Sequence, residues 1–472
     1  MLHWASQSTF YQIVIDRFAT GKNQFKYSKG PHYQQELCHW MGGNLDGIIQ
    51  SLDYLQDLGI GALLLTPFFK GSKYHGYWTT DFLQIDPYFG NQQQLKQLIN
   101  AAHQRDMRVV LDLPFTHCHI DADPARQALN NADSSYQDWF HYDGEGKFKG
   151  FYGDSNLPEL NLEFPAVIKF LKTMLNYWLS FGIDGIRFDH AKRPSTIFWK
   201  QLTDFLRTHY PQVFLLGENW HESGKVGTLS RYLHGELNIP LSTTLRRFLA
   251  QPGQPAINAL MHQVQAQQAL RKEGYLLPTF LDNHDMERAS FVSRKDPAIL
   301  ALGYLLQLSL PYPPIIYYGS ERAQSQTANL STGQYERDRY FREPMAWDGG
   351  EDMVAWVKKL IHIRNNDIEL FTSEPYAMTL LDDHVLSYRY SKGNSMIMVV
   401  INFGLRQQQI THPEISNAML LTGYADLKEQ RQNHLKLQAY SGAILKFNRC
   451  DQLANTKIDI TEIPCILTLA EN

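Results

Sequence analysis

Short apolar runs alternate with helical patterns through the first three quarters of the chain. The runs lack a period-two polar alternation, which is typical of parallel strands buried on both faces. Between them apolar residues recur at helical spacing, as in Leu45–Leu58, which Gly59 ends. Eight strands alternating with helices predict an α/β fold, a (β/α)8 TIM barrel. The predicted strands are Tyr11–Asp16, Gly61–Pro67, Met107–Pro114, Gly182–Asp189, Gln212–Glu218, Glu236–Pro240, Leu276–Asp282 and Pro313–Gly319.

Two regions interrupt this alternation. The stretch from His117 to Glu163 follows the third predicted strand and is polar and rich in Asp, Asn, Gly and Tyr. A loop of that length usually carries function or forms a small domain, so we predict an inserted domain over residues 118–163. From about Leu370 the apolar runs are short and β-like, which predicts a C-terminal antiparallel β-sandwich over residues 371–472. Residues 1–117 and 164–370 would then form the barrel.

Composition narrows the class of protein without identifying it. A chain of 472 residues is long enough for a barrel plus smaller domains, and 43% hydrophobic with 19% charged residues is typical of globular proteins. The net charge of -4 does not supply the basic field that nucleic-acid-binding proteins carry, so no such partner is expected. An aromatic content of 12% would suit sugar stacking, but most such rings fill cores.

The sequence predicts neither a metal site nor a membrane association. Cys38, Cys118, Cys450 and Cys465 lack the spacing of a zinc site or a disulfide framework, and the HCH string at His117–His119 has no acidic or cysteine partner nearby. The N-terminus has no basic segment followed by a long apolar run, and no stretch is apolar enough to span a membrane. We therefore expect a cytoplasmic protein, with a secreted mature form as the alternative and the oligomeric state left open.

Acidic residues stand at or just beyond the ends of three predicted strands. Asp189 ends GIDGIRFD, Glu218 ends QVFLLGE, and Asp285 follows LLPTFLD by three residues. The carboxyl ends of barrel strands meet on one rim, so these side chains should converge there. Pairs of carboxylates can break or make glycosidic bonds, so the sequence predicts a site for that chemistry.

Each of these residues also has a simpler explanation when it is taken alone. Arg187, two positions before Asp189, would keep a nucleophilic carboxylate ionised, but the two could equally form a structural ion pair. Apolar neighbours would raise the pKa of Glu218 and make it a proton donor, although it could instead cap a helix. Asp285 could form a turn. The constellation carries the prediction, and no single member does.

Four strings at strand ends resemble the signature regions of glycoside hydrolase family 13, the α-amylase family. They are DLPFTH (112–117), GIDGIRFDH (182–190), LLGENW (215–220) and FLDNHD (280–285), and they occur in the family's order. HGYWTTDFLQIDPYFG, LPELN and PIIYYGSE resemble its auxiliary regions, so the resemblance covers the whole length. It implies a retaining α-glucan hydrolase that cleaves α-1,4-glucosidic bonds by double displacement.

Carried over position by position, the resemblance also assigns roles. It implies Asp189 as nucleophile, Glu218 as acid/base and Asp285 as transition-state stabiliser. The residues implied to bind the substrate are Tyr77, whose ring would stack on the sugar, together with His117, Arg187, Lys192, Trp220 and His284.

Two groups within the family compete for this chain. HGYW and Lys192 look like classical α-amylases, whereas LPELN, GENWH and LNIPLSTTLRRFL look like the neopullulanase and cyclomaltodextrinase group. That group usually carries an extra N-terminal β-domain, and here the first predicted strand begins close to Met1. We predict an intermediate enzyme that acts on maltooligosaccharides and starch-type substrates. The alternatives are a cyclomaltodextrinase or neopullulanase, a transglycosylating 4-α-glucanotransferase and, more remotely, a non-catalytic glycan-binding protein.

Two departures from the family pattern concern its conserved calcium ion. Thr116 stands where most α-amylases have Asn, and Arg193 where many have His, at positions that usually ligate calcium. A hydroxyl is a poorer ligand than a carbonyl oxygen, and an arginine is itself a cation. We therefore predict that this calcium site is absent, that Arg193 replaces the charge of the ion, and that the enzyme needs no cofactor. Tyr312 replaces the usual Gly before the eighth strand, without an explanation from the sequence.

Overall fold

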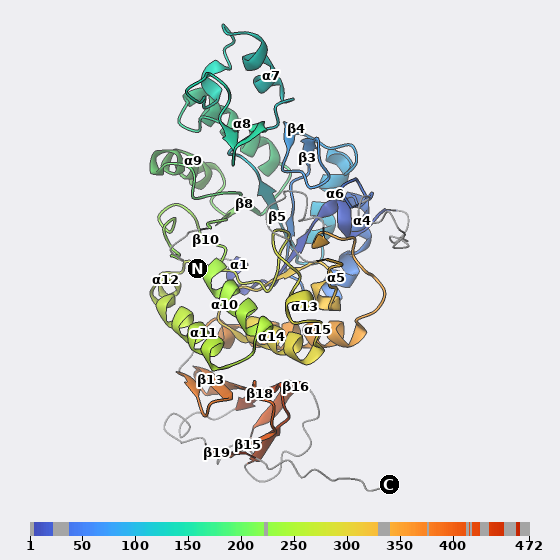
Figure 1. Ribbon diagram of the computed structural model, residues 1–472, viewed down its shortest axis with the longest axis vertical. Helices are drawn as coiled ribbons and strands as arrows, with labels where there is room; N and C mark the ends of the chain where they lie inside the picture. Colours follow the sequence, from blue (N-terminus) through green and yellow to red (C-terminus); the bar gives the residue numbers. More distant parts are fainter. Residues whose placement is uncertain are drawn as a thin grey trace.

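The centre of the molecule is a parallel sheet curled into a barrel (Figure 1). The computed structural model describes residues 4–21, 37–220, 225–328, 340–374, 377–411, 415, 418–424, 434–447 and 459–462. The sheet order is β10-β9-β8-β5-β2-β1-β11. These strands are β1 (Phe10–Ile13), β2 (Ala62–Leu65), β5 (Arg108–Leu113), β8 (Gly185–Phe188), β9 (Phe214–Gly217), β10 (Gly235–Glu236) and β11 (Ile315–Tyr317).

The segment 276–280 closes the barrel between β10 and β11. Parallel bridges join Gly235 to Leu276 and Thr279 to Pro314, and the Thr279 carbonyl accepts from Ile315 N at 2.8 Å. The Pro278 carbonyl accepts from Asn238 N at 2.8 Å on the β10 side, but Pro278 has no N–H to donate there, so the pairing stays too sparse to form a regular strand. The predicted (β/α)8 barrel is confirmed.

The sixth predicted strand, Glu236–Pro240, was wrong beyond its first residue. Strand β10 ends at Glu236, and the predicted residues Ile239 and Pro240 instead begin helix α10 (Ile239–Ala250). Proline is tolerated in a first helical turn because the N–H it lacks would have no partner there. The Asn238 side chain caps the helix by accepting from Leu241 N at 3.3 Å.

Helices cover the outside of the barrel, and the longer ones bury apolar side chains against it. The helix predicted over Leu45–Leu58 is broken at Ser51, whose hydroxyl donates to the Gly47 carbonyl. Gly59 ends it in the left-handed conformation, as expected. The helices are α1 (Trp4–Gln7), α2 (Ile15–Phe18), α4 (Leu45–Gln50), α5 (Leu52–Leu58), α6 (Gln92–His103), α8 (Pro165–Leu179), α9 (Thr196–His209), α10, α11 (Gln254–Ala266), α12 (Gln268–Lys272), α13 (Ala289–Val292), α14 (Pro297–Ser309), α15 (Glu351–Asn366) and α16 (Ile368–Phe371), with a 3-10 turn η2 (Ser320–Arg322).

A long excursion separates β5 from α8 and lies at the top of Figure 1. It contains α7 (Asp123–Asn130), the 3-10 turn η1 (Gln137–Trp139), and the short antiparallel pair β6 (Gly150–Phe151) and β7 (Asp154–Pro158). A second hairpin, β3 (Phe69–Gly71) with β4 (Thr79–Ile85), follows β2. The inserted domain over residues 118–163 stays a prediction as a unit with those boundaries.

Antiparallel strands follow the last barrel helices. One sheet has the order β12-β13-β14-β18-β16, and the other has the order β17-β15-β19. Apolar side chains of both sheets share one core cluster, including Val385, Met398, Ile410, Leu437 and Leu445, as in a sandwich. The strands are β12 (Ala377–Leu380), β13 (Val385–Lys392), β14 (Ser395–Asn402), β15 (Gln408–Thr411), β16 (Met419–Tyr424), β17 (His434–Leu437), β18 (Ser441–Phe447) and β19 (Asp459–Glu462). The remainder of the predicted domain lies outside the described residues, and within them no helix is long and apolar enough to cross a membrane.

Candidate active site

The three acids predicted from the sequence all lie on the C-terminal rim of the barrel. Asp189 follows β8, Glu218 follows β9, and Asp285 lies beyond the closing segment. Asp189 and Glu218 are buried, whereas the Asp285 side chain is 35% exposed. The structure thus brings the three acids from separate parts of the chain to one place, with one of them open toward solvent.

Arg187 on β8 connects the acids of this rim. Its Nη1 lies 2.5 Å from Asp112 Oδ1 and 2.9 Å from Asp189 Oδ1, and its Nη2 lies 2.8 Å from Glu218 Oε1. The period of two along a strand puts Arg187 and Asp189 on the same side, and the parallel register places Asp112 opposite Arg187. One fully buried guanidinium therefore fixes the positions of three carboxylates.

The charges of the Asp189–Glu218 pair differ from the prediction. Burial and then the neighbouring Glu218 charge raise the pKa of Asp189 well above its ordinary value. Burial also raises the pKa of Glu218, but Arg187 and His190 outweigh it and leave that pKa lowered. The sequence prediction of a raised pKa for Glu218 is therefore wrong for the substrate-free site. Glu218 also accepts hydrogen bonds from His190 N at 3.1 Å and Trp220 Nε1 at 2.8 Å, which stabilise its charged form.

The Asp285 carboxylate lies between the side chains of Arg342 and His284. Its Oδ1 accepts from Arg342 Nη2 at 2.8 Å, and its Oδ2 lies 3.0 Å from His284 Nε2. Burial raises its pKa, but His284 and Arg342 more than compensate and hold the pKa of Asp285 well below its usual range. This third acid is therefore a fixed negative charge.

The predicted substrate-binding residues Tyr77, His117 and His284 surround the acids. The Tyr77 hydroxyl donates to Asp112 Oδ2 at 2.7 Å and lies 2.6 Å from His284 Nε2, with the two rings stacked at 5.3 Å. His117 Nε2 lies 3.1 Å from the Tyr77 carbonyl, and burial lowers the pKa of His117 to about 3, so its ring is neutral at pH 7. The His117 ring also stacks on Phe151 of β6 at 4.1 Å, which links the excursion to the rim.

The other two predicted binders, Lys192 and Trp220, lie beside Glu218. The Trp220 indole donates to Glu218 Oε1 at 2.8 Å, and Lys192 Nζ donates to the Trp220 carbonyl at 2.6 Å. Lys192 is exposed at this point of the rim. Trp220 thus contacts Glu218 directly, and Lys192 is held against Trp220 on that side of the rim.

Two residues of the site were missed by the sequence analysis. Gln12 on β1 places its Nε2 2.9 Å from His284 Nδ1. Arg342 donates from Nε to the His284 carbonyl at 2.6 Å and from Nη2 to Asp285. Gln12 could have been found as a polar residue inside an apolar strand run, whereas Arg342 follows no strand-end pattern in the sequence.

The residues at the position of the family's calcium ion do not fit a cation. Arg193 pairs with Glu159, and its guanidinium lies 4.7 Å above the Phe151 ring. Lys149 Nζ lies 3.1 Å from the other oxygen of Glu159. Two cations on one carboxylate leave no net negative charge for a divalent ion. Among the described residues, one group of three His, Cys, Asp or Glu side chains brings its potential ligand atoms within 4.8 Å of one another. It consists of Asp189, His190 and Glu218, and Arg187 contacts both of its carboxylates.

We expect excess chelator to leave activity and melting temperature unchanged, because Arg193 and Lys149 already neutralise Glu159. If an ion were bound, a free ion concentration of about 100 times its Kd would stabilise the fold by about 2.7 kcal/mol, so its removal by chelator would lower the melting temperature. Arg193→Ala should lower the melting temperature in the same buffer and serves as the positive control. A loss of activity or stability in chelator that added calcium restores would refute this prediction.

The fold and the site define a glycoside hydrolase, since a (β/α)8 barrel presents acids from separate strand ends on one rim. The chain belongs to the α-amylase family: the family description "Alpha amylase, catalytic domain" matches residues 12–154 and 143–369.

Several relatives place the chain near the cyclomaltodextrinase and maltogenic amylase part of this family. A cyclomaltodextrinase from Geobacillus thermopakistaniensis (strain MAS1) is 31% identical over 435 residues, which cover 87% of this chain and 71% of that protein. An intracellular maltogenic amylase from Bacillus subtilis (strain 168) is 30% identical over 433 residues, covering 88% and 71%. The crystal structure of an Anoxybacillus α-amylase superposes with a TM-score of 0.80 at 25% identity, covering 95% of this chain and 99% of that one.

Proposed function

We propose that this protein hydrolyses α-1,4-glucosidic bonds in short linear and cyclic maltooligosaccharides, as an enzyme of the cyclomaltodextrinase and maltogenic amylase type. The observation that carries the proposal is the contact of Asp189 and Glu218 with one Arg187 guanidinium on the barrel rim. The preference for short and cyclic substrates follows the relatives named cyclomaltodextrinase and maltogenic amylase. It replaces the more general starch-type substrate as our first choice.

The spacing of the two carboxylates supports double displacement with retention. Oxygens of Asp189 and Glu218 lie within 4.8 Å of each other. Retaining glycosidases keep their carboxyl groups about 5–5.5 Å apart, whereas inverting enzymes leave about 6.5–9.5 Å for a water molecule. In our proposal, Glu218 protonates the glycosidic oxygen while Asp189 attacks the anomeric carbon. Glu218 then takes a proton from water, which attacks the same carbon, frees Asp189 and releases the sugar in the α configuration.

The proton needed for the first step resides on the Asp189–Glu218 pair. Two buried carboxyls in contact do not both ionise easily, so the pair retains a proton at a pH where an isolated acid has lost it. The free site favours that proton on Asp189, since Glu218 has more donors around it. The reaction requires it on Glu218, and a transfer between the two carboxyls achieves this without changing the charge of the site.

Two other functions share the same residues or the same fold. Transglycosylation differs only in the acceptor that resolves the intermediate, a sugar hydroxyl in place of water. Trp220 contacts Glu218 and holds Lys192 beside it, and we propose these two residues as contacts for such an acceptor, which keeps this function as the second candidate. A non-catalytic glycan-binding protein would be free to lose an acid, and here all three acids are present with ordered partners.

The proposal is tested by chromatography of the products from β-cyclodextrin, maltotriose, pullulan and starch. We expect kcat/KM for β-cyclodextrin to exceed that for starch by about tenfold or more, which corresponds to about 1.4 kcal/mol of transition-state binding. NMR of the first product should detect the α anomer. Starch as the preferred substrate would refute the proposed type of enzyme, and a β anomer would refute retention. Products longer than the substrate at high maltotriose concentration would favour transglycosylation.

A further inference from the structure

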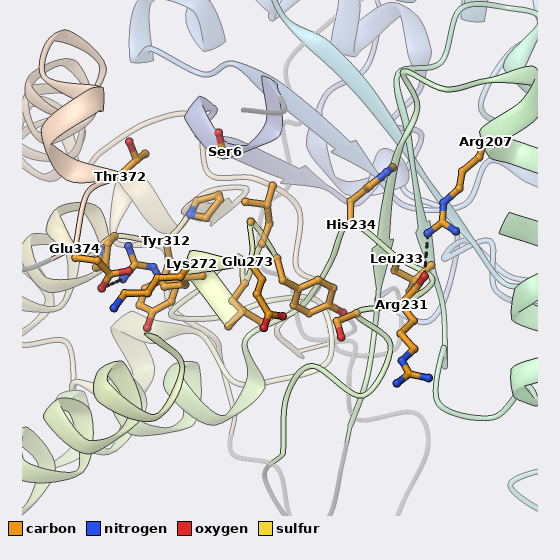
Figure 2. Close-up of a pocket in the computed structure, with 18 residues that line it drawn as sticks. Ser6, Arg207, Arg231, Leu233, His234, Lys272, Glu273, Tyr312, Thr372 and Glu374 are labelled. Atoms are coloured by element: carbon orange, nitrogen blue, oxygen red, sulfur yellow. Dashed lines mark hydrogen bonds and ion pairs between the residues drawn. The ribbon is translucent and has the colours of Figure 1, made fainter. Parts of the chain in front are cut away.

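A pocket of about 920 Å³ lies at the end of the barrel opposite the acids (Figure 2). Its lining includes Ser6 ahead of β1, His234 ahead of β10, Leu276 at the start of the closing segment, and Pro313 ahead of β11. These residues lie at the N-terminal ends of barrel strands, whereas the acids lie on the rim formed by the C-terminal ends. We call this cavity the floor pocket, and the proposed hydrolysis uses none of its residues.

Positive charge is concentrated around the floor pocket. Arg207, Arg231, Arg271 and Lys272 line it, against only Glu273 and Glu374. One of the acids, Glu374, is already paired with Arg271 Nη1 at 3.1 Å. Among the described residues, neither Arg231 nor Lys272 has an acidic partner. In a chain with a net charge of -4, such a concave basic surface attracts anions selectively.

Tyr312 gives this pocket an unsatisfied hydrogen-bond donor. The residue is 1% exposed and lines the cavity, and its hydroxyl has no hydrogen-bond partner in the part of the chain that the structure describes. The Arg271 guanidinium lies 5.2 Å from the centre of its ring. A buried unsatisfied hydroxyl is unfavourable and calls for an explanation. A ligand oxygen in the pocket would accept from this group. It would also give a reason for a tyrosine at the position where the family usually has glycine.

The polar side chains of the pocket lie in two separate groups. Figure 2 shows Lys272, Tyr312 and Glu374 at one end, and Arg207, Arg231 and His234 at the other. Guanidinium, ammonium and phenol groups all donate, which matches a phosphate group whose oxygens only accept. The volume is that of a small-molecule site, too small for a macromolecule to enter.

We propose that the floor pocket binds a phosphorylated small molecule of the sugar-phosphate class. The phosphate would lie near Lys272 and the Tyr312 hydroxyl, and the sugar hydroxyls would extend toward the acid Glu273 and the basic group at the other end. The site is separate from the catalytic rim, so the proposal does not depend on which glucan the enzyme cleaves.

Calorimetry on the full-length protein with glucose 6-phosphate, inorganic phosphate and glucose tests this proposal. We expect glucose 6-phosphate to bind more tightly than inorganic phosphate, with no binding of glucose, and the affinity to fall with added salt. The double substitution of Lys272→Ala and Arg231→Ala should lower the affinity about tenfold or more. Lys96→Ala, at an exposed position of α6, should leave the affinity unchanged. No binding to the wild type at millimolar concentrations, or equal binding to the double variant, would overturn the proposal.

The Tyr312→Phe variant separates a ligand-binding hydroxyl from a structural one. It removes a single oxygen and keeps the ring. Without ligand its melting temperature should equal or exceed that of the wild type, because an unsatisfied group is lost. Its affinity for glucose 6-phosphate should fall about fivefold to tenfold, the loss of one hydrogen bond. A lower melting temperature without ligand, or an unchanged affinity, would overturn the role of Tyr312. Maltotriose hydrolysis without phosphate should be unchanged in every variant, which checks folding independently of binding.

Discussion

Asp189→Asn should abolish turnover of maltooligosaccharides and leave the protein folded. An amide cannot form the covalent bond to the anomeric carbon that the proposed double displacement requires. We expect kcat/KM to fall by about 10⁴-fold or more, the scale on which loss of a nucleophile usually acts. The measurement is the release of reducing ends from maltotriose.

The fold should tolerate this substitution because of the contacts around Asp189. Arg187 keeps its pairs with Asp112 and Glu218, and the amide oxygen of the variant can still accept from Nη1. Burial already raises the pKa of Asp189 and so favours a neutral carboxyl, and the neutral amide of the variant therefore suits the same surroundings. The melting curve should stay close to that of the wild type. Asp204→Asn on the exposed face of α9 is the matched control and should keep full activity. Near-normal turnover in a purified, folded Asp189→Asn variant would refute the nucleophile assignment.

The meeting of the acids could be predicted because it depends only on strand direction. Asp189, Glu218 and Asp285 each come after an apolar run, and parallel strands of one barrel necessarily end on the same rim. The pairing of Arg187 with Asp189 followed in the same way from the period of two along β8. These features are local in the sequence, so a pattern of residues is enough to find them.

The charge state of the acids could not be predicted in this way. It depends on how close Arg187 Nη2 comes to Glu218 and on two further donors, the Trp220 indole and His190 N. His190 has a left-handed backbone conformation with φ of 47°, and its N–H donates to Glu218. No pattern of residues in the sequence predicts that conformation. Arg342 was missed for a related reason, because only the tertiary fold brings it to Asp285.

The element boundaries were least predictable where proline interrupts the pairing. Leu276–Asp282 closes the barrel as predicted, but Pro278 allows only isolated bridges there. The run Glu236–Pro240 looks like a strand in sequence because Leu237 and Ile239 are apolar. Only Glu236 of this run belongs to β10, and the Asn238 cap begins helix α10 two residues later. The side-chain contacts that decide between strand and helix cannot be recognised from the positions of the apolar residues alone.

Glu218→Gln should lower kcat/KM by an amount that depends on the leaving group of the substrate. With maltotriose the departing sugar oxygen needs a proton, so we expect kcat/KM to fall about 10²- to 10⁴-fold, the usual contribution of general acid catalysis. With α-glucosyl fluoride the departing fluoride needs far less assistance, so formation of the glycosyl-enzyme should be much less affected. Glu145→Gln in the exposed part of the excursion is the matched control and should behave as the wild type with both substrates.

The pH dependence of the same variant gives an independent test of Glu218. In the wild type the pKa at which the Asp189–Glu218 pair loses its proton is raised. The rate of maltotriose hydrolysis should therefore decline as the pH rises through that pKa, because the proton donor is then deprotonated. Glu218→Gln removes the second titrating carboxyl and its repulsion of Asp189, so Asp189 ionises at lower pH beside Arg187. The alkaline decline should therefore be absent when the variant is assayed with α-glucosyl fluoride. Equal losses on both substrates, or an unchanged alkaline decline, would mean that Glu218 is not the proton donor and that another group protonates the leaving oxygen.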